Sequence, residues 1–69
     1  MRISARNQFK GTVKSVNKGP VSAEVIVSIA PGIDVVAVIS TGSAENLGLA
    51  VGKQAQVLIK ASSVLVATD

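Results

Sequence analysis

A strict alternation of apolar and polar residues in the middle of the chain limits the possible folds more than any other feature. Over residues 21–29, every odd-numbered residue is apolar, and every even-numbered residue except Ile26 is polar or charged. Successive side chains of a β-strand point to opposite faces, so a period of two residues is that of a strand with one buried face. Turn-forming residues bound the segment at residues 17–20 and 30–32. The pattern predicts a strand over residues 21–29 in an all-β fold.

Similar segments lie on both sides of this strand. Residues 9–16 alternate, and so do residues 54–60, where Ala55, Val57 and Ile59 are expected to face inward. Residues 34–40 are apolar on both faces, which is typical of a strand that is central in a core or covered by a partner. In so small a chain we expect the partner. A short segment at residues 2–6 and a terminal strand at residues 64–66 complete the series.

Residues 41–47 form the one helix candidate, of at most two turns. Ser40, Thr41 or Ser43 is expected to cap its start, and Gly48 suits the left-handed position after its end. Residues 60–63 predict a single helical turn. Five strands and one short helix in this order are typical of a small barrel of the oligonucleotide/oligosaccharide-binding (OB) type, here one domain over residues 1–69.

The composition excludes most catalytic and metal-binding chemistry. The chain of 69 residues has no Cys, His, Trp or Tyr, which leaves no disulfide, no thiol nucleophile, no histidine base and no ordinary zinc site. Its four acidic residues are too scattered to predict a pair of catalytic carboxylates: Glu24, Asp34, Glu45 and Asp69. We therefore expect a protein that is not an enzyme and uses no catalytic cofactor.

The small size of the chain predicts self-association. A domain this short buries only about 60% of the surface of its unfolded chain, and it has neither a disulfide nor a metal to compensate. Because 48% of the residues are hydrophobic, we expect some apolar surface to be buried against other subunits. No apolar run approaches the roughly 20 residues of a membrane-spanning helix, and the first residues lack the apolar centre of a signal peptide. The expected location is the cytoplasm, without a membrane partner.

The charge balance predicts an anionic ligand. Seven Lys and Arg residues against four acidic residues give a net charge of +3. Nucleic acid is the alternative partner, as for many small basic OB barrels. However, single-strand binders stack bases on aromatic side chains, at about 1–3 kcal/mol for each base, and Phe9 is the only aromatic residue. We therefore expect no nucleic acid and favour a small oxyanion.

A small oxyanion needs several hydrogen-bond donors that converge without an acceptor. Ser4 and Arg6 are two residues apart, so they share a face if the segment is extended. Lys60 is followed by two hydroxyl residues, and residues 40–43 offer hydroxyls and the start of the helix. Each of these residues taken singly also fits an ordinary role as a helix cap or a solvated charge.

Three motifs taken together resemble the molybdenum-pterin-binding Mop domain of the TOBE/Mop family. An isolated domain of this length resembles the molbindins in particular. Related domains occur at the C-terminus of molybdate-responsive regulators and of molybdate-transporter ATPases. The resemblance runs through the whole chain and rests on three segments: Ser4-Ala5-Arg6-Asn7-Gln8, Leu47-Gly48-Leu49-Ala50-Val51-Gly52 and Lys60-Ala61-Ser62-Ser63-Val64.

The resemblance implies a five-stranded barrel that assembles as a homo-hexamer, a trimer of dimers, with molybdate or tungstate bound at subunit interfaces for storage of molybdenum. It implies that Ser4 and Arg6 contact the oxyanion from one subunit. Lys60 and the main chain of Ala61 and Ser62 would close the site from a neighbour. Ser40 matches a hydroxyl position in the related regulators and is a further candidate. The second class of site, near symmetry axes, suggests the turn with Lys18, Gly19 and Val21, and Asn7 and Ser63 are additional candidate contacts.

Two other functions stay open beside storage. One is the nucleic-acid-binding OB module. The other is a structural or regulatory module detached from a transporter or a repressor, which would share the oxyanion ligand but act through a protein partner.

Overall fold

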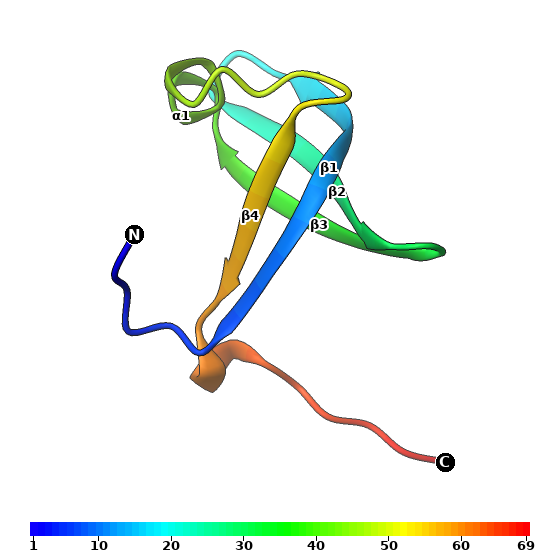
Figure 1. Cartoon of the computed structure of the whole chain (residues 1–69). Helices are drawn as coiled ribbons and strands as arrows, with labels where there is room; N and C mark the ends of the chain where they lie inside the picture. The colour runs from blue at the N-terminus through cyan, green and yellow to red at the C-terminus, as the bar shows by residue number, and fades with distance from the viewer.

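Four antiparallel strands form one curled sheet in the computed structural model, which describes residues 1–69 (Figure 1). The order of the strands in the sheet is β3-β2-β1-β4. A short helix follows β3, and a single 3-10 turn follows β4. The elements are β1 (Asn7–Lys18), β2 (Ser22–Ala30), β3 (Ile33–Ser40), α1 (Thr41–Asn46), β4 (Gln54–Ile59) and η1 (Ala61–Ser63).

Strand β1 is the longest element, and its two halves pair with different strands. Residues 7–12 pair with β4, whereas residues 12–18 pair with β2. A β-bulge between Val13 and Ser15 shifts the register, so that Val13 and then Val16 point toward the core. Strand β1 extends two residues beyond the predicted segment 9–16 at each end. This division of β1 between two partners bends the sheet into an open half-barrel.

Strand β1 lies very close to β2 at Gly11. A Cβ atom at this position would lie 2.5 Å from the carbonyl oxygen of Ser28 and 2.8 Å from a methyl carbon of Val27. No side chain fits there, because real Cβ atoms essentially never make such short contacts. Gly11 therefore allows the close crossing of β1 over β2 at the point where β1 changes partners.

The predicted alternation places the core. Val13, Val25 and Val27 form its buried centre, and half-buried side chains from β3, β4 and the loop after α1 pack against them. Ala23 on β2 is also buried, as the pattern predicts. Val21, predicted to share this face, is 78% exposed because β2 begins one residue later and leaves Val21 in the turn.

Helix α1 is one residue shorter than the predicted segment 41–47 and begins as expected. The Ser40 hydroxyl accepts a hydrogen bond from the Ser43 N–H at 3.0 Å, which makes Ser40 the N-cap. Gly48 follows the helix with a φ of +62°, the left-handed position expected for it. Ala44 is completely buried where α1 contacts β2 and β3. None of the helical segments has the length and apolar character needed to span a membrane.

The single chain contains four strands and not the predicted five. Residues 64–66 form no strand, and Leu65 and Val66 are each 93% exposed. Residues 2–6 also form no strand, with bends at Ser4 and Arg6. A strand needs a neighbouring edge that supplies hydrogen bonds to its backbone, and these two segments pair with neither edge of the sheet. The sheet therefore stays open, with β3 and β4 at its edges.

We predict that Gly11→Ala destabilises the fold. The new methyl group would force β1 away from Ser28 or Val27, and overpacking of this kind typically costs about 1–3 kcal/mol. The free energy of unfolding from urea denaturation measures the effect.

The matched control is Gly42→Ala, which makes the same change inside α1. A Cβ at Gly42 meets nothing within 4 Å, and alanine favours a helix over glycine by about 0.5–1 kcal/mol. We expect Gly42→Ala to leave stability unchanged or raise it. Equal stability of the two variants would contradict the close crossing at Gly11.

Candidate functional site

Pairing of β1 with β4 brings two of the predicted polar segments to one end of the sheet. Asn7, the first residue of β1, pairs with Ile59, the last residue of β4. Arg6 and Lys60 are the next residues beyond this pair, so their backbones leave the sheet at the same point. In Figure 1 this point lies at the bottom of the molecule, beside η1. Residues 54 positions apart in the sequence thus become neighbours at one site.

Side-chain amides hold the backbone at this end. The Asn7 side chain is half-buried, and its Nδ2 donates a hydrogen bond of 3.2 Å to the carbonyl oxygen of Ile59. Gln8 Nε2 donates to the carbonyl oxygen of Ala5, within the bent segment that carries Ser4. Because of the bends, Ser4 and Arg6 do not lie on one face of an extended strand as the spacing predicts. Both residues are nevertheless exposed at this end of the chain.

The turn η1 leaves two main-chain donors without a partner inside the turn. Its own hydrogen bonds are donated by Ser63 to the Lys60 carbonyl at 2.9 Å and by Val64 to the Ala61 carbonyl at 3.2 Å. The N–H groups of Ala61 and Ser62, at the start of the turn, take no part in these bonds. No side chain caps the turn. Exposed main-chain donors therefore lie directly after Lys60.

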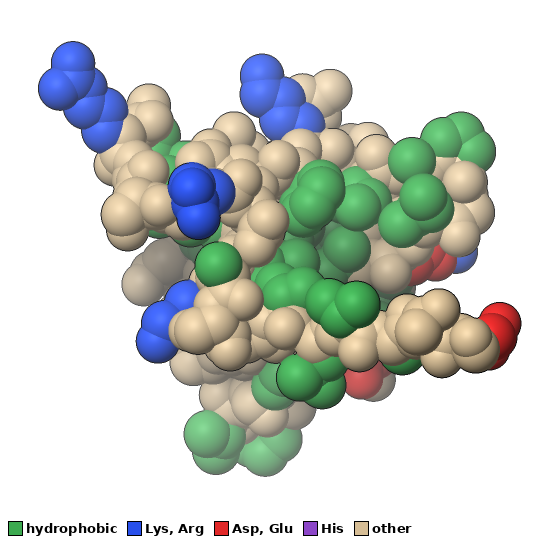
Figure 2. Space-filling view, turned by 90° about the horizontal axis from the view of Figure 1, so that it is seen from below, with side chains coloured by type: hydrophobic (Ala, Val, Ile, Leu, Met, Phe, Trp, Pro, Cys, Tyr) green, Lys and Arg blue, Asp and Glu red, His purple; other side chains and the backbone are tan.

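The charged side chains at this end have no acidic partner. The single salt bridge of the chain joins Lys14 to Asp34 at 2.8 Å, away from Arg6 and Lys60. Figure 2 views the molecule from this end and shows Lys and Arg side chains standing out along one side, with hydrophobic side chains across the middle. No group of three or more acidic residues is placed to hold a metal cation. Positive side chains and main-chain N–H groups are hydrogen-bond donors, which are the groups that a small anion requires.

The remaining predicted residues gather at the opposite end of the sheet. Thr41 joins them, since its N–H donates to the Val21 carbonyl at 2.9 Å and its hydroxyl donates to the Gly19 carbonyl at 2.7 Å. Ser40 precedes Thr41 and also lies here, next to α1, where its hydroxyl is hydrogen-bonded to Ser43. Lys18 ends β1 at this side, eleven residues after Asn7. One chain therefore does not bring Ser40 together with Arg6 and Lys60.

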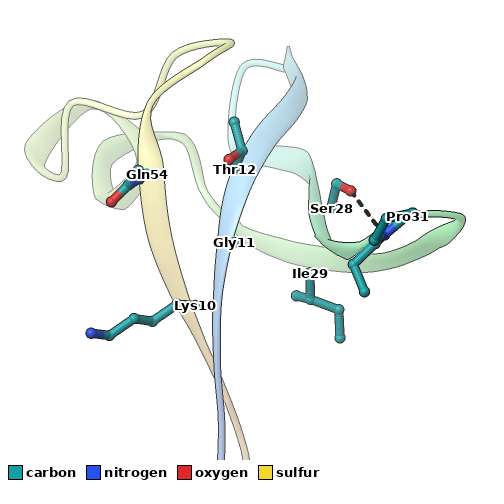
Figure 3. A pocket seen from close by; sticks show the side chains of 8 residues that line it. Lys10, Gly11, Thr12, Ser28, Ile29, Pro31 and Gln54 are labelled. Atoms are coloured by element: carbon teal, nitrogen blue, oxygen red, sulfur yellow. Dashed lines mark hydrogen bonds between the residues drawn. The ribbon is translucent and has the colours of Figure 1, made fainter.

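A third region was not predicted from the sequence. An open hollow of about 480 Å³ lies where β1 passes between β2 and β4, and Figure 3 shows its lining. Lys10 extends away from Ser28 in this view, and the Ser28 hydroxyl is already hydrogen-bonded to the Ala30 carbonyl at 3.3 Å. No converging set of donors forms there. The two ends of β1 remain the places where the predicted residues gather.

Sequence reasoning missed the contacts that arrange the site. The sequence motifs give Gln8 no role of its own, and the alternation places Ile59 only as an inward-facing residue. Asn7 lies two residues before the alternating segment 9–16, but its partner Ile59 follows only from the pairing of β1 with β4.

Comparison with known proteins identifies the family. A family model described as "TOBE domain" matches residues 3–66. The chain is 47% identical over 66 residues to molybdenum-pterin-binding protein 3 of Clostridium pasteurianum, covering 96% of this chain and 97% of that protein. It is 44% identical over 69 residues to a probable molybdenum-pterin-binding protein of Haemophilus influenzae, covering 100% of each. Identity of 44% to the molybdenum transport protein ModE of Herbaspirillum seropedicae spans the whole chain but only 26% of ModE.

Solved structures agree with this assignment. MopII from Clostridium pasteurianum superposes with a TM-score of 0.90 at 40% identity, covering 97% of this chain and 100% of MopII. A molybdate-binding protein from Sporomusa ovata gives 0.91 at 35% identity, covering 99% of this chain and 100% of that one. ModG, a cytoplasmic molybdate-binding protein solved with molybdate bound, gives 0.89 at 38% identity over 94% of this chain and 46% of its own. By its sequence and its fold, this chain belongs to the TOBE-domain family.

Proposed function

We propose that this protein binds molybdate, or the closely similar tungstate, as a free oxyanion and serves as a store of molybdenum in the cytoplasm. The observation that carries the proposal is that the backbones of Arg6 and Lys60, neither in a salt bridge, leave the sheet at the same end, beside the unpaired main-chain donors of η1. Relatives similar over nearly their whole length are molybdenum-pterin-binding proteins, and a structural neighbour holds molybdate. No catalytic cofactor enters this function.

The charges and donors match a tetrahedral dianion. An ionised ligand held away from water is stable only when it is paired with opposite charge and hydrogen-bonded. Arg6 and Lys60 supply two formal positive charges against two negative ones. The hydroxyl of Ser4 and the main-chain N–H groups of Ala61 and Ser62 add neutral donors, and Ser63 lies beside them. Guanidinium and ammonium groups offer donors and no acceptors, which suits a ligand that has only acceptors to offer.

We propose that the oxyanion is bound at interfaces of a homo-hexamer built as a trimer of dimers. Both polar segments lie at the same end of a chain, so a two-fold axis near that end would place Ser4 and Arg6 of one copy against Lys60 of the second, twice over. Several large hydrophobic side chains are exposed in the single chain, among them Val36 (59%), Val38 (70%) and Leu65 (93%). Burial of such apolar side chains between copies would stabilise a domain whose own core is small.

A second class of oxyanion site is proposed at the other end of β1. The turn after β1 holds Lys18, Gly19 and Val21, and hydrogen bonds of Thr41 bring Ser40 beside it. Ser40 can contribute to the site at Arg6 only from another copy, because the two lie at opposite ends of one chain. Assembly is therefore part of the proposed binding mechanism.

The similarity to part of ModE favours a second candidate function. Since this chain matches about a quarter of that protein, the same oxyanion-binding unit would act as a regulatory module through a protein partner. Capture of a transporter or repressor component by the molybdate-loaded protein would favour this candidate over storage. Competition by an oligonucleotide for bound molybdate would instead favour a nucleic-acid-binding module.

We predict that Arg6→Ala and Lys60→Ala each weaken molybdate binding about 10–100-fold. A hydrogen bond to a charged group is worth roughly 1.5–3 kcal/mol, which corresponds to a loss of this size. Isothermal titration calorimetry of each purified variant measures the change in the dissociation constant.

Lys10→Ala and Lys14→Ala are the matched controls, because both remove one positive charge from an exposed position on β1. Their charges lie away from the proposed site and are screened by salt, so we expect a much smaller loss. Equal losses for all four variants would contradict the assignment of the site.

We predict that the chain is hexameric and that molybdate stays bound to the assembly. Native mass spectrometry with and without molybdate reports the number of subunits and of bound oxyanions in one measurement. A stable monomer that takes up neither molybdate nor tungstate would contradict both the assembly and the function.

A further inference from the structure

The side-chain amide of Asn7 is committed to the protein itself. Its Nδ2 donates to the carbonyl oxygen of Ile59, a residue 52 positions away in the sequence. The bond joins the first residue of β1 to the last residue of β4, directly between the backbones that continue into Arg6 and Lys60. Asn7 is half-buried, unlike the exposed Arg6 and Lys60 beside it.

This hydrogen bond reinforces the pairing of Asn7 with Ile59 at the end of the β1–β4 ladder, next to the proposed site. A main-chain carbonyl carries partial negative charge and has two lone pairs, so a free one next to a dianion would repel it. The Asn7 amide occupies the Ile59 carbonyl, the last one before Lys60. Gln8 occupies the Ala5 carbonyl in the other segment in the same way. Two acceptors of these segments are thus engaged within the chain.

The same bond supports the start of η1. Ile59 ends the sheet, Lys60 follows without a side-chain cap, and the turn begins at Ala61. The Asn7 side chain adds a second contact to the strand pairing at Ile59, where the chain leaves β4 two residues before Ala61. The partners that orient the ligating groups of a site commonly matter for affinity nearly as much as the ligating groups themselves.

We propose that Asn7 is a positioning residue of the oxyanion site, which acts through the Ile59 carbonyl and does not itself bind the oxyanion. The inference rests on the proposed function. Asn7 thus takes a different role from the one that the resemblance suggested, which was only that of one more candidate contact.

The test is Asn7→Leu, which keeps the approximate shape of the side chain and removes its donor. In the ligand-free protein, NMR order parameters of the Ala61 and Ser62 amides should fall from the rigid range near 0.85 toward about 0.6. The reason is that the substitution removes the hydrogen bond to the Ile59 carbonyl, which holds the chain just before the turn. In the same variant, calorimetry should show molybdate affinity reduced on the order of tenfold.

Asn17→Leu is the matched control, since it makes the same substitution at an exposed position near the other end of β1. It should change neither measurement. If Asn7→Leu does not fold, Asn7→Ala removes the amide without added bulk and gives the same two readouts.

Each result decides the proposal. A more mobile turn together with weaker binding in the Asn7 variant alone supports it. Unchanged order parameters with lost affinity would make Asn7 a direct ligand, and unchanged affinity would remove it from the site, so either outcome overturns the proposal. If the wild-type protein itself fails to bind molybdate, the proposed function fails, and this is distinguishable because no variant is involved.

Discussion

The structure depends on the pairing of one long strand with two different partners. β1 pairs with β4 through its first half and with β2 through its second half, and Gly11 allows the change of partner because no side chain fits against Ser28 there. This arrangement curls the sheet over a core of three valines. It also fixes the two ends of the sheet, and all the residues proposed to bind oxyanions lie at these ends. The pairing of β1 with two partners therefore determines both the fold and the positions of the proposed sites.

The chemistry of the site follows from what surrounds its positive charges. In a chain with four acidic residues, only Asp34 forms a salt bridge, and its partner is Lys14. Arg6 and Lys60 are left to bind something else. Amide side chains meanwhile occupy carbonyl oxygens of the adjacent backbone. A region rich in donors and cations, with acceptors engaged internally, is suited to a small dianion and poorly suited to a metal cation.

The small core and the open sheet both favour association with other copies of the chain. Only five residues are buried in the single chain, and the last segment expected to be a strand pairs with neither edge of the sheet. Hydrophobic side chains lie across the face that also carries the end of the sheet with Arg6 and Lys60 (Figure 2). Association would bury apolar surface and complete an oxyanion site in the same step, which would couple stability to ligand binding.

The sequence by itself determined the secondary structure of the middle of the chain. Period-two alternation predicted β2 and β4 nearly to the residue, and Ser40 with Gly48 predicted both ends of α1, because these signals are local. The three motifs also predicted the family correctly. Only the tertiary structure decided that Arg6 and Lys60 leave the sheet at the same end, that Ser40 lies at the far end, and that Asn7 engages Ile59. These facts depend on strand pairing over long sequence separations. Residues 64–66 have a strand-like sequence and form no strand in the single chain, because a strand also requires a partner edge that local sequence cannot supply.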